Sequence, residues 1–122
     1  MVRPWHVLVA LLGSGVALFV GVYVIRPRLI LRDFDAFLRR HPVGTAIAEV
    51  GADPFVGRAT VIALDERVVS HAERASLPSR LAGRPDGNLD VMWTHTPPFG
   101  RVSWIVRYEH GRIVDARTHD LD

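Results

Sequence analysis

Histidine is the residue type in this sequence most able to bind a metal, because the chain contains no cysteine. That absence excludes thiolate zinc sites, iron–sulfur clusters and thiol nucleophiles. No two histidines have the four-residue spacing that places a metal-binding pair on one face of a helix. A sheet could bring His95 and His119 together, with Asp120 nearby, but histidines at loop edges are more often solvated. We therefore predict no metal site and no cofactor.

Other groups with binding or catalytic chemistry also fail on spacing. Asp86, Asn88 and Asp90 match the first half of an EF-hand loop, but Val91 and Pro97 stand where that loop needs Gly and Glu. The part of the chain after the apolar N-terminus has no Gly-x-Ser-x-Gly nucleophile elbow, and no phosphate-binding loop or lysine occurs. We expect no catalytic residues and no enzyme activity. A membrane-tethered enzyme is kept as a third alternative, because catalytic sites are built in space.

Size and charge limit the remaining classes of protein. The chain has 122 residues, 48% of them hydrophobic, and a net charge of +2, which suits one small folded domain. Residues 1–42 hold 6 Arg and 2 Asp, a net charge of +4, whereas residues 43–122 hold 9 Arg and 11 Asp or Glu, a net charge of −2. The positive excess therefore lies beside the apolar N-terminus, and we expect no nucleic-acid partner.

Residues 1–26 are predicted to form a transmembrane anchor. From Trp5 to Ile25 the chain has no formal charge, and as a helix this stretch is about 31 Å long, close to one bilayer crossing. Trp5 and Tyr23 stand near its two ends, where amphipathic aromatic residues prefer the membrane interface. A cleaved signal peptide is the alternative, but the apolar run is longer than a signal core and no clear cleavage site follows it.

The arginines around the apolar stretch predict its orientation. One arginine precedes the span and several follow it closely, which favours an N-terminus outside and a C-terminal domain in the cytoplasm. We expect a bacterial inner membrane location, with a periplasmic domain as the alternative. The predicted membrane-interface arginines are Arg26, Arg28, Arg32, Arg39 and Arg40.

Residues 27–42 are predicted to form an amphipathic helix next to the membrane. Ile30, Phe34, Phe37 and Leu38 recur at helical spacing as one apolar stripe, with most of the arginines away from it. Two interpretations have equal weight. The helix lies in the membrane interface with its guanidinium groups on anionic lipid headgroups, or the stripe packs on the domain or on a partner subunit. Pro27 is expected to kink or end the spanning helix.

Residues 43–122 are predicted to form a small α+β domain. A short helix is expected from Thr45, as its cap, to a stop at Gly51. Residues 59–71 are compatible with a β-hairpin or a helix, and residues 76–88 are expected to form a loop because they are rich in Pro, Gly and Ser.

The last third of the sequence predicts an antiparallel β-meander with the short helix on one face. Apolar and polar residues alternate over 89–94 and 102–108, and a His110-Gly111 turn leads into a third strand at 113–118. The stiff loop at Pro97, Pro98 and Phe99 is a candidate interaction knob. The fold class is thus α+β, with one transmembrane helix, an amphipathic interfacial helix and a small sheet domain.

Residues 43–118 resemble the BamE-like small envelope proteins. The resemblance rests on the segment 43–54 (Val-Gly-Thr-Ala-Ile-Ala-Glu-Val-Gly-Ala-Asp-Pro), on Trp93 and Phe99, and on the strand–turn–strand from Trp104 to Val114. It implies a capped helix, a three-stranded sheet and a role in stabilising outer-membrane assembly machinery through protein contacts. The topology alone is similar to the H subunit of photosynthetic reaction centres.

We therefore expect a non-catalytic single-pass accessory subunit that binds and stabilises a larger bacterial membrane complex, respiratory, photosynthetic or other. A BamE-like periplasmic assembly factor is the alternative. The expected partners are integral membrane subunits and anionic lipid headgroups. Candidate partner-binding residues are Phe34, Phe37, Pro97, Pro98 and Phe99.

Overall fold

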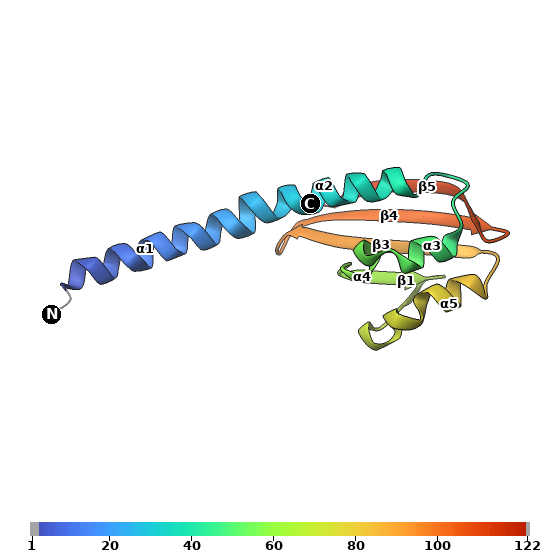
Figure 1. Cartoon of the computed structure of the whole chain (residues 1–122), viewed down its shortest axis with the longest axis horizontal. Helices are drawn as coiled ribbons and strands as arrows, with labels where there is room; N and C mark the ends of the chain where they lie inside the picture. The colour runs from blue at the N-terminus through green and yellow to red at the C-terminus, as the bar shows by residue number, and fades with distance from the viewer. Residues whose placement is uncertain (1–2, 122) are drawn as a thin grey trace.

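The computed structural model describes residues 3–121 and has an α+β architecture, with a long N-terminal helix running onto a small sheet domain (Figure 1). The helix is continuous over Pro4–Arg40. It comprises α1 (Pro4–Val20), a π-helical turn (Gly21–Ile25) and α2 (Arg26–Arg40). Its apolar part is long enough to cross a membrane by length and composition.

Pro27 does not end the helix, which was one of the two outcomes predicted for it. The π-helical turn immediately precedes it, and the Arg26 N–H bonds to the Gly21 carbonyl, five residues back. A wider turn at this point accommodates the proline ring and its missing N–H without breaking the helix. The helix therefore carries the apolar N-terminal segment directly onto the domain.

Five antiparallel strands form one sheet in the order β2-β1-β3-β4-β5. The prediction of three C-terminal strands is confirmed, and of the two alternatives for residues 59–71 the hairpin is the one observed. Its turn places Asp65 and Glu66 at positive φ, as His110 and Gly111 are in the later turn. The strands are β1 (Val61–Leu64), β2 (Arg67–Val68), β3 (Gly87–Thr96), β4 (Gly100–Glu109) and β5 (Arg112–Leu121).

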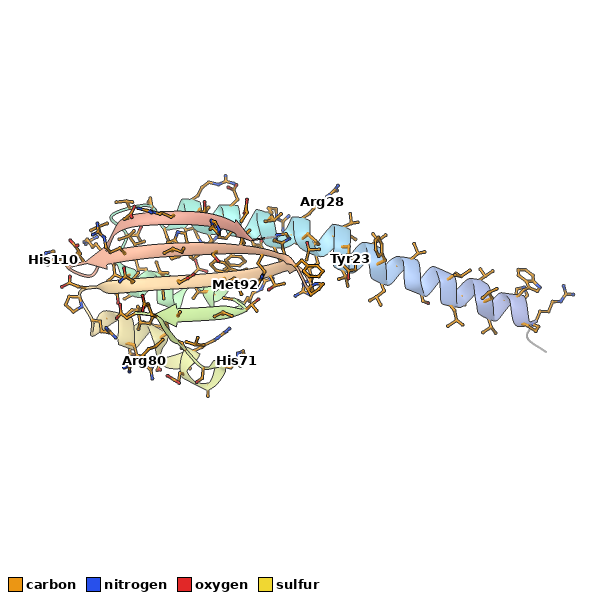
Figure 2. The ribbon with its side chains drawn as sticks, turned by 180° about the vertical axis from the view of Figure 1, so that it is seen from behind. Tyr23, Arg28, His71, Arg80, Met92 and His110 are labelled. Atoms are coloured by element: carbon orange, nitrogen blue, oxygen red, sulfur yellow. The ribbon has the colours of Figure 1, made fainter. Side chains whose placement is uncertain are left out.

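The helices cover one face of the sheet, and Figure 2 looks onto the opposite face, where Met92 lies. Besides α2, the covering helices are α3 (Ile47–Ala52) and α4 (Pro54–Gly57), while a 3₁₀ helix (His71–Ser76) and α5 (Leu77–Ala82) lie next to α3 at the β1 edge of the sheet (Figure 1). The core lies between the two layers. Its largest fully buried side chains include Phe37, Ile47, Ile62, Leu77, Leu81, Leu89, Trp104, Tyr108 and Ile113.

Two local predictions are wrong. Thr45 does not cap α3, because its hydroxyl donates to the Pro42 carbonyl and Ala46 takes the N-cap position. Gly51 does not stop α3 but lies inside it. A Cβ there would come within 2.8 Å of Leu81 Cδ1, so glycine allows α3 and α5 to pack closely.

The segment 76–88 is not a continuous loop, because α5 occupies its first half. Leu77 and Leu81 lie one helical turn apart and are both buried, so tertiary packing outweighs the local abundance of Pro, Gly and Ser. Pro78 lies in the first turn of α5, where a backbone N–H has no partner within the helix.

Candidate functional site

The joint between the long helix and the domain is built from aromatic rings. Phe37 contacts Trp104 and Trp93 with ring centroids 4.9 and 5.4 Å apart, and Phe34 meets Trp93 at 5.3 Å. Phe55 stacks on Trp93 at 4.7 Å, and the Trp93 indole donates to the Phe55 carbonyl over 2.9 Å. The apolar stripe of α2 is therefore part of the domain core.

This packing corrects the assignment of Phe34 and Phe37 as partner-binding residues. Phe34 is 8% exposed and Phe37 is fully buried. Of the two interpretations of the amphipathic helix, packing on the domain is the one observed, and its apolar face is not free to lie on a membrane surface.

An ion-pair cluster fixes the end of α2. The Asp53 carboxylate is 2.9 Å from the Arg40 guanidinium and 2.7 Å from His41 Nε2, and it accepts the Phe55 N–H at the start of α4. Burial alone would raise the pKa of Asp53, but the bonds from His41, Phe55 and Arg40 outweigh it and lower that pKa below 3.8. All of the carboxylate's contacts join secondary-structure elements, which identifies the cluster as a structural clamp.

The five predicted interface arginines have different surroundings. Arg39 pairs with Asp35 one turn earlier, and Arg40 is held by Asp53. Arg32 lies 3.9 Å from Asp33. Within residues 3–121, Arg26 and Arg28 have no carboxylate at ion-pair distance and directly follow the apolar segment, with the Arg28 side chain projecting away from the domain (Figure 2).

In the described part of the predicted anchor, residues 3–26, no residue is buried. No residue of Pro4–Val20 is buried in the single chain. Trp5 and Tyr23, predicted to lie at the two interfaces, are 55% and 45% exposed, and Tyr23 packs against Phe19.

The β3–β4 turn lies at the end of the sheet nearest the junction of α1 and α2 (Figure 1). Phe99 at this turn is 72% exposed, so it does not fold back onto the sheet. Pro98 is exposed and Pro97 half-buried. Pro98 and Phe99 are thus on the surface, and the role of this turn in partner binding stays a prediction.

A pocket of about 360 Å³, which we call the junction pocket, lies between residues 21–30 of the long helix and the edge of the domain. Ile25, Arg26 and Leu29 line it from the helix, and Arg58 and Thr94 from the domain. Sequence reasoning identified Arg26 but missed the domain residues, because they come from separate segments with no shared local pattern. A wider groove of about 680 Å³ runs beside the Asp53 clamp, and Asp33, Arg40, Glu49 and Arg58 are among its charged lining residues.

The residues tested for chemistry in the sequence are dispersed. His119 lies on β5, opposite Ser103 of β4. His95 lies on β3 and bonds to the neighbouring Thr96. Because β4 separates the two strands, the two histidines are not brought together. Asp86 accepts the His110 N–H at a turn. Within residues 3–121, no group of three or more His, Asp or Glu side chains is placed to hold a metal ion.

Neither family models, curated proteins nor solved structures give a match to this chain. The BamE-like resemblance of residues 43–118 stays a prediction.

Proposed function

We propose that this chain is a non-catalytic, single-pass accessory subunit that binds and stabilises a larger bacterial membrane protein complex. The observation that carries the proposal is the single helix of 37 residues, which has no buried residue over Pro4–Val20 but places Phe37 in the domain core. A simple tether needs only a flexible linker. A rigid joint instead fixes the domain relative to whatever the anchor binds.

The exposed surfaces are compatible with partner contacts in two places, one on the anchor within the membrane and one on the domain outside it. The anchor offers apolar side chains such as Phe19, which is 60% exposed, and the β3–β4 turn offers Phe99 beside the helix junction. In the membrane the anchor offers these side chains for packing against another helix, whereas Phe99 lies outside the apolar span, where a partner would remove its apolar surface from water. The remaining interface arginines, Arg26 and Arg28, are in position to meet anionic headgroups.

Photocrosslinking in native membranes tests the proposal. A photoreactive phenylalanine analogue is placed at Phe19, at Phe99 and, as a control, at Val68, which is 70% exposed on the short edge strand β2. We expect a discrete crosslink to an integral membrane protein from Phe19 or Phe99 and none from Val68. If neither position gives a product beyond the Val68 control, the subunit proposal is wrong.

The proposed orientation places the domain in the cytoplasm and the N-terminus outside. The chain has no cysteine, so a Val68→Cys variant carries one reactive thiol at an exposed site. A membrane-impermeant maleimide should label it only after the inner membrane is broken. Labelling once the outer membrane alone is permeable would place the domain in the periplasm and favour a BamE-like assembly factor instead.

A further inference from the structure

The pocket beside the helix junction combines an apolar wall with cationic and hydroxyl groups. Ile25 and Leu29 of the helix are about half exposed, at 52% and 44%, so they present apolar surface. Arg26 follows Ile25 in sequence, and Arg58 faces the helix from the domain side of the same pocket. An apolar wall and a cationic rim at the end of an apolar span suit a molecule with a hydrocarbon tail and an anionic head.

The charges at the pocket match one negative charge. Arg58 lies 3.4 Å from Asp33 and over the Phe55 ring at 5.8 Å, so its charge is partly compensated. Arg26 has no such carboxylate among residues 3–121. The two guanidinium groups and the one carboxylate sum to a single positive charge, the complement of a phosphodiester monoanion.

A hydroxyl pair adds a donor. Thr60 Oγ1 accepts the Thr94 N–H at 3.0 Å and donates to Thr94 Oγ1, also at 3.0 Å. The Thr94 hydroxyl is thereby an acceptor toward Thr60, which leaves its own proton available to a ligand oxygen in the pocket. Arginine forks and a hydroxyl donor are the groups that proteins use to hold phosphate oxygens.

From this arrangement we propose that the junction pocket binds one anionic glycerophospholipid. Its phosphodiester is held by Arg26, Arg58 and Thr94, and its acyl chains pass Ile25 and continue along the apolar span. The proposal rests on the membrane crossing assumed in the proposed function. The bound lipid fills the space between the anchor and the domain, and so adds to the rigidity of their joint.

The test uses the full chain in nanodiscs that contain equal amounts of phosphatidylglycerol and phosphatidylcholine, followed by native mass spectrometry of the released protein. We expect one phosphatidylglycerol to be retained per chain, and Arg26→Gln, Arg58→Gln and Thr94→Val each to lower the retained fraction, by about tenfold for the arginines. Arg28→Gln is the matched control. It removes the same charge two residues from Arg26, and the Arg28 side chain points away from the domain (Figure 2). Asp33→Asn should increase retention several-fold, since it frees Arg58 from its carboxylate.

Three results would overturn the proposal. Equal retention of phosphatidylglycerol and phosphatidylcholine would show that the pocket does not select for an anionic headgroup. A loss of retained lipid in Arg28→Gln as large as in Arg26→Gln would show a general effect of the arginines near the end of the span. Displacement of the lipid by millimolar inorganic phosphate would identify a soluble anion as the ligand. Circular dichroism of each variant establishes that it is folded, and the increase in Asp33→Asn cannot arise from misfolding. Failure of insertion into nanodiscs would instead contradict the membrane crossing, so the two failures are distinguishable.

Discussion

The ring of Phe37 meets the indole of Trp104 edge to face, with centroids 4.9 Å apart and planes at 82°. One residue belongs to the long N-terminal helix and the other to the central region of the sheet, on β4. Aromatic pairs in this arrangement are stabilising beyond the area they bury. The contact makes α2, which continues directly from the predicted anchor, a core element of the domain.

Replacing Phe37 with Ala should therefore destabilise the domain strongly. The side chain is fully buried among three other aromatic rings and His41, so its loss leaves a cavity and costs about 3–5 kcal/mol of unfolding free energy. Urea unfolding of the full chain in mild detergent, followed by tryptophan fluorescence, measures the change. Phe99→Ala is the control, and its unfolding free energy should stay within about 0.5 kcal/mol of the original. Equal effects of the two changes would refute the packing described.

The Asp53 clamp predicts a loss of stability in acid. In the folded protein the pKa of Asp53 is lowered below its ordinary value of 3.8. The charged carboxylate therefore contributes its full stability above the unfolded pKa, and this contribution is lost as pH falls through the folded pKa. Asp53→Asn should lower the unfolding free energy at pH 7 by about 1–3 kcal/mol and flatten its fall below pH 4. The control Asp35→Asn changes a carboxylate that is 64% exposed and should leave both quantities nearly unchanged. An unaltered acid slope in Asp53→Asn would exclude this carboxylate as its source.

Arg74 should be irreplaceable by Lys. Its guanidinium donates to the carbonyls of Gly57, Ala59 and Thr60, at 3.2, 2.6 and 3.2 Å, and so ties the 3₁₀ helix to the start of β1. A lysine ammonium keeps the charge but cannot reproduce this planar fork, so we expect a cost of about 1–3 kcal/mol. Thermal unfolding monitored by circular dichroism checks it against Arg67→Lys on exposed β2. If Arg74→Lys melts at the original temperature, the bonds from Arg74 to the three carbonyls do not stabilise the fold.

Two glycines should respond differently to replacement by Ala. At Gly51 a new Cβ would lie 2.8 Å from Leu81 Cδ1 and 3.2 Å from Pro78 Cα, so α3 and α5 must separate, at about 1–3 kcal/mol. At Gly57 nothing lies within 4 Å, and the change should leave stability unaltered or slightly raised. Differential scanning calorimetry of the two variants gives the comparison. A Gly51→Ala protein as stable as Gly57→Ala would contradict the close helix packing.

Much of the fold is predictable from short-range pattern. Alternation of apolar and polar residues locates β3 and β4, and His110-Gly111 identifies the turn from β4 into β5. Both signals depend only on neighbours within a few residues. The helical spacing of Phe34 and Phe37 likewise predicts an apolar face. It cannot say what covers that face, because a membrane, a partner and the chain's own sheet all require the same spacing.

The site is less predictable, because its parts are distant in sequence. Arg58 and Thr94 come from different segments, and only the folded sheet brings them beside Arg26. The helix at 77–82 was missed for a related reason, since its formation depends on burying Leu77 and Leu81 against elements elsewhere in the chain.

The central claim, membership of a larger membrane complex, is tested most directly by the mass of the particle that carries this chain. The tagged chain is extracted from its native membrane in mild detergent, and sedimentation with mass spectrometry gives the composition of the particle. We predict stoichiometric recovery with at least one other integral membrane protein. Recovery of the 13.6 kDa chain as a lone monomer in its micelle would contradict the proposed function.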